Sequence, residues 1–272
     1  MKGIERGPVI ASPPGNGVAA ARTARAAGTL AVHAAGSLRS VFNAIGGAFV
    51  AEYPGQAVRL DFGPSGLLRE RLLKSPGGGV FASANMAHPE ELLRAGRAGP
   101  VRPFARNGLC AVVRPGVDVT TATLVERMLD PAIKLGTSTP KADPAGDYAW
   151  ELFDRVERSG IAGARARLEA KALQLVGGPT APAPDALSRS AYAAILGSGQ
   201  ADIVLTYRTN AAQALRENSR LRFVAVPPEI QVGVQYGVTV LSGSAAPAWE
   251  FVDFLLGERG QALLAAEGFD AP

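Results

Sequence analysis

The sequence of 272 residues has very little cysteine and no long hydrophobic run. Its single cysteine, Cys110, cannot form a disulfide within the chain, which excludes a disulfide-stapled scaffold. Cys110 lies in the apolar run 109–113, and this setting favours a buried structural thiol. No stretch approaches the roughly 20 apolar residues that a membrane-spanning helix needs. The length is nevertheless sufficient to bury a large core in one large or two modest domains.

Clustered positive charge is also lacking. The formal net charge of +4 comes from 28 Lys and Arg against 24 Asp and Glu, and the basic residues are scattered. Neither a dense basic run nor an alternation of basic and aromatic residues occurs, so nucleic acid is not expected as a partner.

Histidine is scarce, and the patterns of enzyme active sites are missing. His33 lies in an apolar strand, where packing is the simpler role, and His88 is expected to be exposed at a helix start. No metal-ligand spacing, phosphate loop or Ser-His-Asp arrangement is present. Asp143 and Asp147 form a possible carboxylate pair, although Asp143 is typical of the start of a helix. We expect neither an enzyme nor a cofactor, and an enzyme using Asp143 or His33 is the alternative.

The N-terminal region, residues 1–28, has few large apolar residues and is rich in Ala, Gly, Pro and Arg. It has no apolar segment of the length found in a secretory signal, and its composition predicts a disordered lead. Either the protein stays in the cytoplasm or the export signal is absent from this chain.

From residue 29 onward, predicted strands and helices alternate, which favours an α/β fold with mainly parallel sheets. The run 101–113 reads as a strand that crosses into a second domain and is broken at 106–108. We expect one lobe from 29–106 plus 230–272 and a second lobe from 107–229. The expected strands are 29–34, 57–62, 79–83, 133–137, 202–206, 221–226 and 234–241, and the main expected helices are 38–53, 66–74, 89–94, 122–129, 145–156, 162–173, 187–196 and 210–216.

Three turns rich in small residues follow the first three strands of this pattern. They carry Ser37, Ser65 and Ala84, and they contain neither Lys nor Arg. In parallel sheets ligands bind beyond the carboxyl ends of the strands, and helix N-termini there offer unpaired N–H donors. The sequence therefore predicts an anion site built from hydroxyls and backbone amides. For either serine alone, capping of the following helix is the simpler interpretation; two serines and a third turn at matching positions favour a site.

Seven short motifs occur in an order that resembles the periplasmic molybdate-binding proteins, the solute receptors of molybdate and tungstate ABC importers. The resemblance covers residues 30–269. The motifs are AAGSL at 34–38, FGPSG at 62–66, VFASAN at 80–85, FARN at 104–107, LGT at 135–137, PAGDYA at 144–149 and GQADIVLTY at 199–207.

This resemblance implies a two-lobed periplasmic-binding-protein fold of type II-like form, in which two crossing strands join the lobes and an oxyanion binds between them. The implied ligand residues are Ser37, Ser65, Ala84, Arg189 and Tyr207, with an amide contributed at Arg189 and a phenol hydroxyl at Tyr207. It implies molybdate or tungstate as the ligand, a membrane permease as the partner, a monomer, a periplasmic location, and capture by lobe closure.

The chain departs from the family pattern at several positions. Pro64 and Gly66 stand where serines are common, Asn85 replaces a usual Asp, and Arg189 replaces an apolar residue. An Arg189 side chain that points inward favours another anion, such as sulfate, phosphate or an organic acid. If it points outward, molybdate is retained. A receptor of the same fold for another anion and a cytoplasmic anion sensor or carrier are therefore the alternatives.

Overall fold

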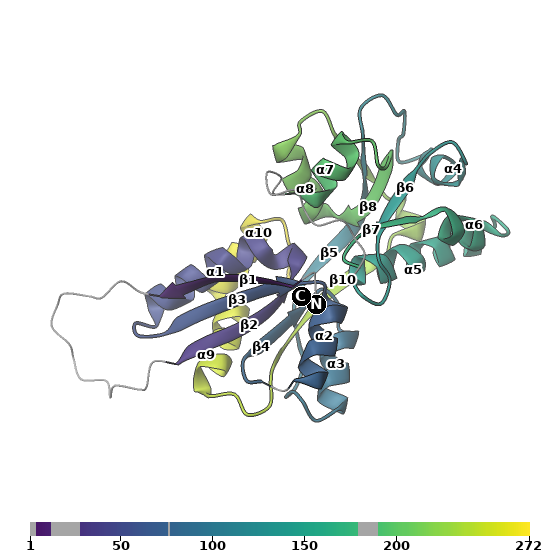
Figure 1. The fold of residues 1–272 in the computed structure, drawn as a ribbon. Coiled ribbons are helices and arrows are strands. Elements are labelled where there is room, and N and C mark those ends of the chain that lie inside the picture. The colour runs from purple at the N-terminus through teal and green to yellow at the C-terminus, as the bar shows by residue number, and fades with distance from the viewer. Residues whose placement is uncertain (1–3, 12–27, 76, 179–189) are drawn as a thin grey trace. The chain divides into compact units, whose positions relative to one another are not determined.

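The computed structural model describes residues 4–11, 28–75, 77–178 and 190–272 (Figure 1). These residues form two compact units. We call Ile4–Ala105 with Gln235–Pro272 the N-terminal unit, and Arg106–Val234 the inserted unit. The chain passes from the first to the second within strand β5 (Arg102–Val113) and returns within β10 (Gly233–Val240).

The N-terminal unit is built on a sheet in which three central strands run parallel and the two outer strands run antiparallel to their neighbours. In sheet order the strands are β1 (Glu5–Ala11), β3 (Ala57–Gly63), β2 (Thr29–Ala35), β4 (Val80–Ser83) and β10. The short helix η1 (Gly36–Leu38) leads into α1 (Arg39–Glu52); the other helices are α2 (Ser65–Lys74), α3 (Ala87–Arg94), α9 (Ala246–Leu256) and α10 (Glu258–Ala266).

The helices of this unit follow the apolar periodicity of the sequence. The α1 stripe buries Phe42, Ile45 and Phe49, and the helix packs against α9 and α10, while α2 packs against α3 (Figure 1). Phe251 of α9 lies with its ring centroid 6.2 Å from that of Phe42 and 5.2 Å from that of Phe49. Aromatic pairs at these separations add to the stabilisation that comes from buried area alone.

The inserted unit has a smaller mixed sheet. Strands β6 (Leu135–Ser138), β7 (Leu173–Val176) and β8 (Ile203–Tyr207) run parallel, and β5 pairs antiparallel with β8 and with β9 (Arg222–Ala225). The helices are α4 (Leu124–Leu129), α5 (Pro144–Arg158), α6 (Ala164–Lys171), α7 (Ala191–Gly197), α8 (Arg208–Glu217) and the short η2 (Pro228–Ile230).

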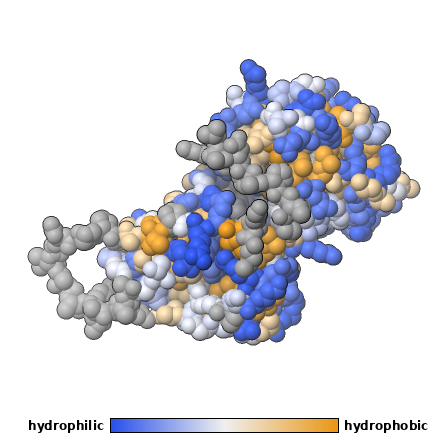
Figure 2. Space-filling model, viewed as in Figure 1, coloured by the Kyte–Doolittle hydropathy of each residue, from blue (hydrophilic) through white to orange (hydrophobic). Residues whose placement is uncertain are grey.

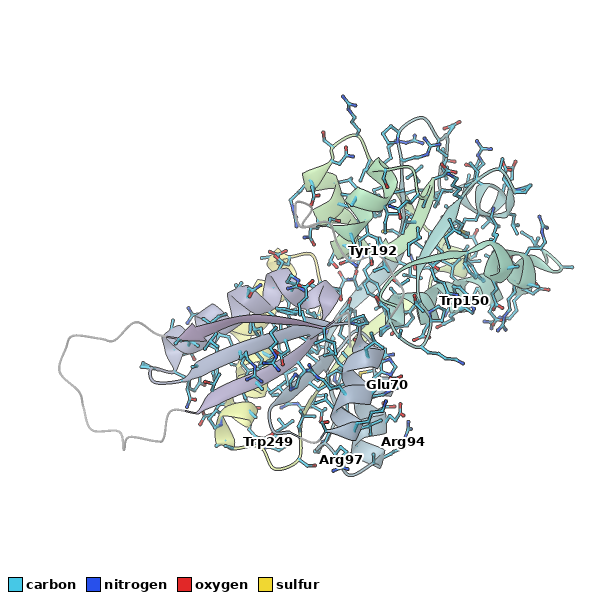
Figure 3. The ribbon with its side chains drawn as sticks, viewed as in Figure 1. Glu70, Arg94, Arg97, Trp150, Tyr192 and Trp249 are labelled. Atoms are coloured by element: carbon cyan, nitrogen blue, oxygen red, sulfur yellow. The ribbon has the colours of Figure 1, made fainter. Side chains whose placement is uncertain are left out.

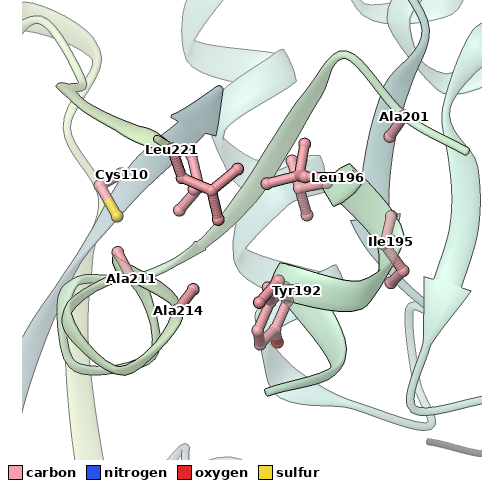
Figure 4. Packing of buried hydrophobic residues seen from close by; sticks show 11 residues of the cluster. Cys110, Tyr192, Ile195, Leu196, Ala201, Ala211, Ala214 and Leu221 are labelled. Atoms are coloured by element: carbon pink, nitrogen blue, oxygen red, sulfur yellow. The ribbon is translucent and has the colours of Figure 1, made fainter. Parts of the chain in front are cut away.

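Side chains from β5, β8, α7 and α8 form one core of the inserted unit, in which Cys110, Tyr192 and Leu196 are buried (Figure 4). Cys110 has no exposed surface, as predicted, and burial raises the pKa of its thiol to about 12. A thiol with this pKa stays protonated and unreactive at neutral pH.

Three of the predicted elements are wrong. Part of the N-terminal lead, Glu5–Ala11, is not disordered but forms β1 on the edge of β3, while residues 12–27 lie outside the described residues. The predicted break at 106–108 does not occur, since β5 runs through it. The end of the predicted helix 162–173 is also misplaced: α6 ends at Lys171, and Leu173 starts β7.

The visible face of the molecule is a mixture of hydrophilic and hydrophobic side chains (Figure 2). In the part of the chain that the structure describes, the exposed large hydrophobic residues are Val9, Leu93, Ile161, Leu173, Phe223 and Trp249. Across the same residues, no helix combines the length and the hydrophobicity needed to span a membrane.

Candidate functional site

Three parallel strands of the N-terminal unit end at the same edge of its sheet. Ala35 at the end of β2 lies opposite Gly63 at the end of β3, and Ala34 lies opposite Ala82 of β4. The turns that carry Ser37, Ser65 and Ala84 leave the sheet directly after these paired positions, as the sequence pattern predicts.

Ser37 lies in η1 and is half-buried. Its hydroxyl oxygen is 3.2 Å from the hydroxyl oxygen of Tyr236, a residue of β10 that the sequence pattern did not single out. The alternative role of Ser37, capping of the following helix, does not apply: Ala35 and Leu38 occupy the N-cap positions of η1 and α1, and neither helix has a side-chain cap. The Ser37 hydroxyl is therefore not used by the helix that follows it.

Ser65 is fully buried and is the first residue of α2, whose N-cap is Pro64. It does not cap the helix either. Its hydroxyl oxygen instead accepts a hydrogen bond of 3.2 Å from the backbone N–H of Ala84. Two of the predicted site residues, from turns after different strands, are thus in direct contact.

The turn beyond Ala84 is held by neutral groups. The Ser83 hydroxyl donates to the Asn85 side-chain oxygen over 2.9 Å, and that oxygen also accepts from the backbone N–H of His88 over 3.1 Å. An amide side chain in place of a carboxylate at position 85 leaves this turn without a negative charge.

His88 is not exposed, contrary to the prediction, because it lies in the first turn of α3 with only 5% of its surface accessible. Its Nδ1 atom is 3.4 Å from a guanidinium nitrogen of Arg69 on α2. Burial, and then the charge of Arg69, lower its pKa to about 4. His88 is therefore neutral at pH 7.

His33 is a buried strand residue, as expected, but it has charged neighbours. Its Nδ1 atom is 2.8 Å from a nitrogen of Arg71 and 3.2 Å from an oxygen of Asp61. Burial lowers the pKa of His33 to about 4, with Arg71 adding to the effect and Asp61 opposing it. A neutral imidazole between these groups accepts a hydrogen bond from Arg71.

Arg39 is a charged residue near the turns that sequence reasoning missed, because the three motifs themselves contain neither Lys nor Arg. Its guanidinium carbon lies 4.6 Å from the ring centroid of Phe62, and a guanidinium nitrogen lies 2.7 Å from a carboxylate oxygen of Glu5. Arg39 could have been found from its position, because it lies two residues after Ser37 at the start of a predicted helix.

The predicted residues of the second lobe are Tyr207 and Arg189. Tyr207 is the last residue of β8 and is 1% exposed, and its ring centroid lies 6.3 Å from that of Tyr148 on α5. Arg189 lies outside the described residues, so the question of its direction stays a prediction.

The N-terminus of α5 is capped by Asp143, as the sequence predicts. A carboxylate oxygen of Asp143 accepts from the backbone N–H of Ala145 over 3.0 Å. Asp147 in the same turn accepts from the backbone N–H of Lys141 over 2.7 Å. Burial raises the pKa of Asp143 to about 6, and the charge of Asp147 adds to the rise.

Neutral polar side chains of α7, β8 and α8 form a network at this end of the inserted unit. The Asn210 amide donates to the Tyr192 hydroxyl over 3.3 Å and to the Thr206 hydroxyl over 3.1 Å. Figure 3 labels Tyr192 on α7. Within the described ranges, no group of three or more His, Cys, Asp or Glu side chains is arranged to hold a metal ion.

Comparison with known proteins identifies the family. A model of bacterial extracellular solute-binding proteins matches residues 30–270. The protein PM1146 of Pasteurella multocida is 36% identical over 230 residues, which are 82% of this chain and 90% of that protein. The molybdate-binding protein ModA of Mycobacterium bovis is 26% identical over 255 residues, covering 90% of this chain and 85% of ModA.

Solved structures share the fold at low sequence identity. The periplasmic molybdate-binding protein of Azotobacter vinelandii has a TM-score of 0.67 at 19% identity, covering 89% of this chain and 99% of that one. The sulfate-binding protein SubI of Mycobacterium tuberculosis has a TM-score of 0.73 at 17% identity, covering 89% and 86%. The chain belongs to the bacterial extracellular solute-binding proteins, a family of transport receptors whose fold matches that predicted from the motifs.

Proposed function

We propose that this protein is the solute receptor of an ABC importer and captures a small tetrahedral oxyanion, with molybdate or tungstate as the first candidates. The observation that carries the proposal is the contact between Ser65 and Ala84 from separate strand ends, next to the Ser37 turn. Hydroxyl and amide donors on small-residue turns replace the hydration of a compact anion without bringing a counter-charge.

Neutral donors are sufficient for useful affinity. Hydrogen bonds to a charged group contribute about 1.5–3 kcal/mol each, and several of them sum to micromolar binding or better. We propose that Ser37, Ser65 and Ala84 supply donors from the N-terminal unit, and that Tyr207 and the amide of residue 189 supply donors from the inserted unit. The Ala84 amide donates to the Ser65 hydroxyl, so an anion that accepts from this amide competes with Ser65 for the same donor.

A transport role follows from the family rather than from any catalytic group. We propose a periplasmic location, a monomeric receptor, and recognition of the loaded form by a membrane permease. Loading is driven by contacts made only in the ligand-bound state, which shift the population toward it.

A receptor for sulfate, phosphate or an organic acid is the second candidate. Pro64 and Gly66 supply no side-chain donors where serines are common in molybdate receptors, and a sulfate-binding protein shares the fold. The backbone arrangement of the turn supports molybdate as the ligand. The small number of hydroxyl donors in the turn supports it less and leaves room for another anion.

A thermal-shift panel of molybdate, tungstate, sulfate and phosphate, followed by calorimetric titration of the strongest ligand, tests the proposal. A ligand that binds only the folded state raises the melting temperature, and the shift grows with its concentration. We expect the largest shift with molybdate or tungstate. A larger shift with sulfate or phosphate selects the second candidate, and an unchanged melting temperature with every anion contradicts both.

A further inference from the structure

The inserted unit holds a carboxylate among hydroxyl groups at the carboxyl ends of its parallel strands. Asp143 is the N-cap of α5, Ser138 ends β6, and Tyr207 ends β8, which pairs with β6 in the sheet. Asp143 therefore lies at the same sheet edge as Tyr207, the proposed donor of this unit. An anion that binds there lies close to Asp143, which is itself negatively charged whenever its carboxyl group is ionised.

The chain packs closely around this carboxylate. Gly177, directly after β7, has a φ of +75°, and a Cβ atom at this position would overlap the Oδ2 atom of Asp143. A Cβ atom at Gly178 would lie 2.5 Å from the hydroxyl oxygen of Thr139. Glycine allows the backbone to approach to this distance, and the approach removes water from one side of the carboxylate.

In the part of the chain that the structure describes, the groups of other elements that act on Asp143 are neutral. The Ser138 hydroxyl of β6 acts on both Asp143 and Tyr192, lowering the pKa of each, and Ser138 has no exposed surface. The Tyr192 hydroxyl accepts a hydrogen bond from Asn210, which leaves its own proton to be donated elsewhere. Burial, and then the charge of Asp143, raise the pKa of Tyr192 to about 12, so the phenol stays protonated.

Among the described residues, no Lys or Arg side chain contributes to the shifted pKa of Asp143. Burial raises it first, the Ala145 amide lowers it, the charge of Asp147 raises it, and the Ser138 hydroxyl lowers it. Together these effects raise the pKa of Asp143 to about 6, so the carboxyl group changes its charge close to neutral pH. A bound anion nearby raises that pKa further, because like charges favour the protonated form.

We propose that Asp143 makes anion capture proton-linked: it must take up a proton before a fully ionised oxyanion binds at the carboxyl edge of the inserted unit beside Tyr207. The inference rests on the proposed function. It assigns Asp143 as a specificity-determining residue that disfavours fully ionised oxyanions at high pH. An anion with its own hydroxyl group donates a hydrogen bond to the ionised carboxylate and escapes this penalty.

The linkage between proton uptake by Asp143 and anion binding determines whether affinity rises or falls with pH. If the bound state has the higher Asp143 pKa, binding takes up a proton, and affinity rises as pH falls. Between the two pKa values the rise approaches about tenfold for each pH unit, and below both values affinity is constant. A carboxylate that only caps α5 gives no such dependence.

Calorimetric titration of the full chain with molybdate from about pH 8 to about pH 5.5, in pairs of buffers with different ionisation enthalpies, measures both affinity and proton uptake. We expect tighter binding at the acidic end and uptake of up to one proton near neutral pH. Binding with a constant affinity and no proton uptake overturns the inference but leaves the proposed function intact. Absence of binding by every oxyanion at every pH overturns both.

Two matched variants assign the effect to one residue. Asp143→Asn keeps an oxygen that can cap the Ala145 amide but removes the charge, so we expect about tenfold tighter molybdate binding at pH 8 and a flat pH profile. Asp147→Asn makes the same change in charge one turn along α5. We expect it to keep the pH dependence but to shift the profile toward lower pH, because the charge that helps to raise the Asp143 pKa is gone. A pH dependence that persists in Asp143→Asn contradicts the assignment. If that variant does not fold, proton uptake by the wild type decides, with Asp147→Asn as control.

Discussion

In the proposed function, single side chains at the strand ends of the N-terminal unit donate hydrogen bonds to the anion. These side chains differ in burial and in their present partners. Ser65 is fully buried with its hydroxyl on the Ala84 amide, whereas Ser37 is half-buried and contacts Tyr236. The sequence predicted the two serines and their turns as parts of a site. It did not identify Tyr236, whose partner lies 199 residues away in the chain and which has no local signal.

The substitution Ser65→Ala removes a hydroxyl from the proposed site and leaves the Ala84 N–H without its partner. We expect molybdate affinity to fall at least about tenfold, and stability to fall by about 1–3 kcal/mol because a buried donor is left unsatisfied. Titration calorimetry and urea denaturation measure the two effects. Ser40→Ala is the matched control, since the Ser40 hydroxyl is exposed and bonds to Glu267. Equal affinity of Ser65→Ala and wild type would remove Ser65 from the site.

His88 predicts an acid-sensitive stability. Its pKa is about 6.5 in the unfolded chain and about 4 in the fold, so between these values the unfolded state binds more protons. Stability is therefore fully present above pH 6.5 and is lost as the pH falls toward 4, by up to about 3 kcal/mol from this group. His33 contributes in the same direction.

Denaturation with urea at a series of pH values measures this loss. We expect His88→Gln to flatten part of the slope between pH 6.5 and 4, because glutamine does not titrate. His33, left intact in this variant, accounts for the remaining slope. The same slope in His88→Gln and wild type would show that the buried imidazole does not titrate in this range.

At the scale of elements, the sequence predicted the strands and helices that have strong periodicity and missed those that tertiary contacts create. The strand β7 has four residues and follows α6 after one residue, so its pattern merges with that of the helix. The strand β5 continues through 106–108 because the Asn107 side chain bonds to Thr209 of α8 and to the Gly108 amide. Polar residues with such partners remain in a strand although their propensity argues against it.

The approach of α5 to β6 gives a test at this scale. A Cβ atom at Gly146 would lie 2.5 Å from the nitrogen of Pro140 and 2.6 Å from the oxygen of Ser138, both in the backbone. We expect Gly146→Ala to destabilise the protein by about 1–3 kcal/mol through overpacking. Gly47→Ala is the matched control, since a Cβ there meets nothing within 4 Å and alanine in a helix stabilises by about 0.5–1 kcal/mol. Thermal denaturation compares the variants, and equal melting temperatures would contradict the close packing.

At the scale of the whole molecule, the two units share one chain that crosses twice, within β5 and within β10. The sequence predicted two lobes because the alternation of strands and helices restarts after a long apolar strand. It placed the crossings at 106/107 and 229/230, and the structure has them at 105/106 and 234/235. The second crossing is five residues from its predicted position, because β10 runs through it without a turn residue that would mark it.

The proposed donors come from both units, which leads to a prediction for the whole chain. An anion that binds Ser65 and Tyr207 together suppresses the opening motions of the segments that carry them, and their amide hydrogens then exchange more slowly. We expect saturating molybdate to slow exchange at 65–68 and 84–88 in the N-terminal unit and also at 207–210 in the inserted unit.

Hydrogen–deuterium exchange read by mass spectrometry measures this protection, with α6 as the internal control because it carries none of the proposed donors. Tyr207→Phe removes one hydroxyl and keeps the ring that packs against Tyr148, so we expect it to weaken binding about tenfold. In that variant, protection at 207–210 should appear only at higher molybdate concentration. Protection confined to the N-terminal unit in the wild type would instead mean that the strand-end turns hold the anion without help from Tyr207.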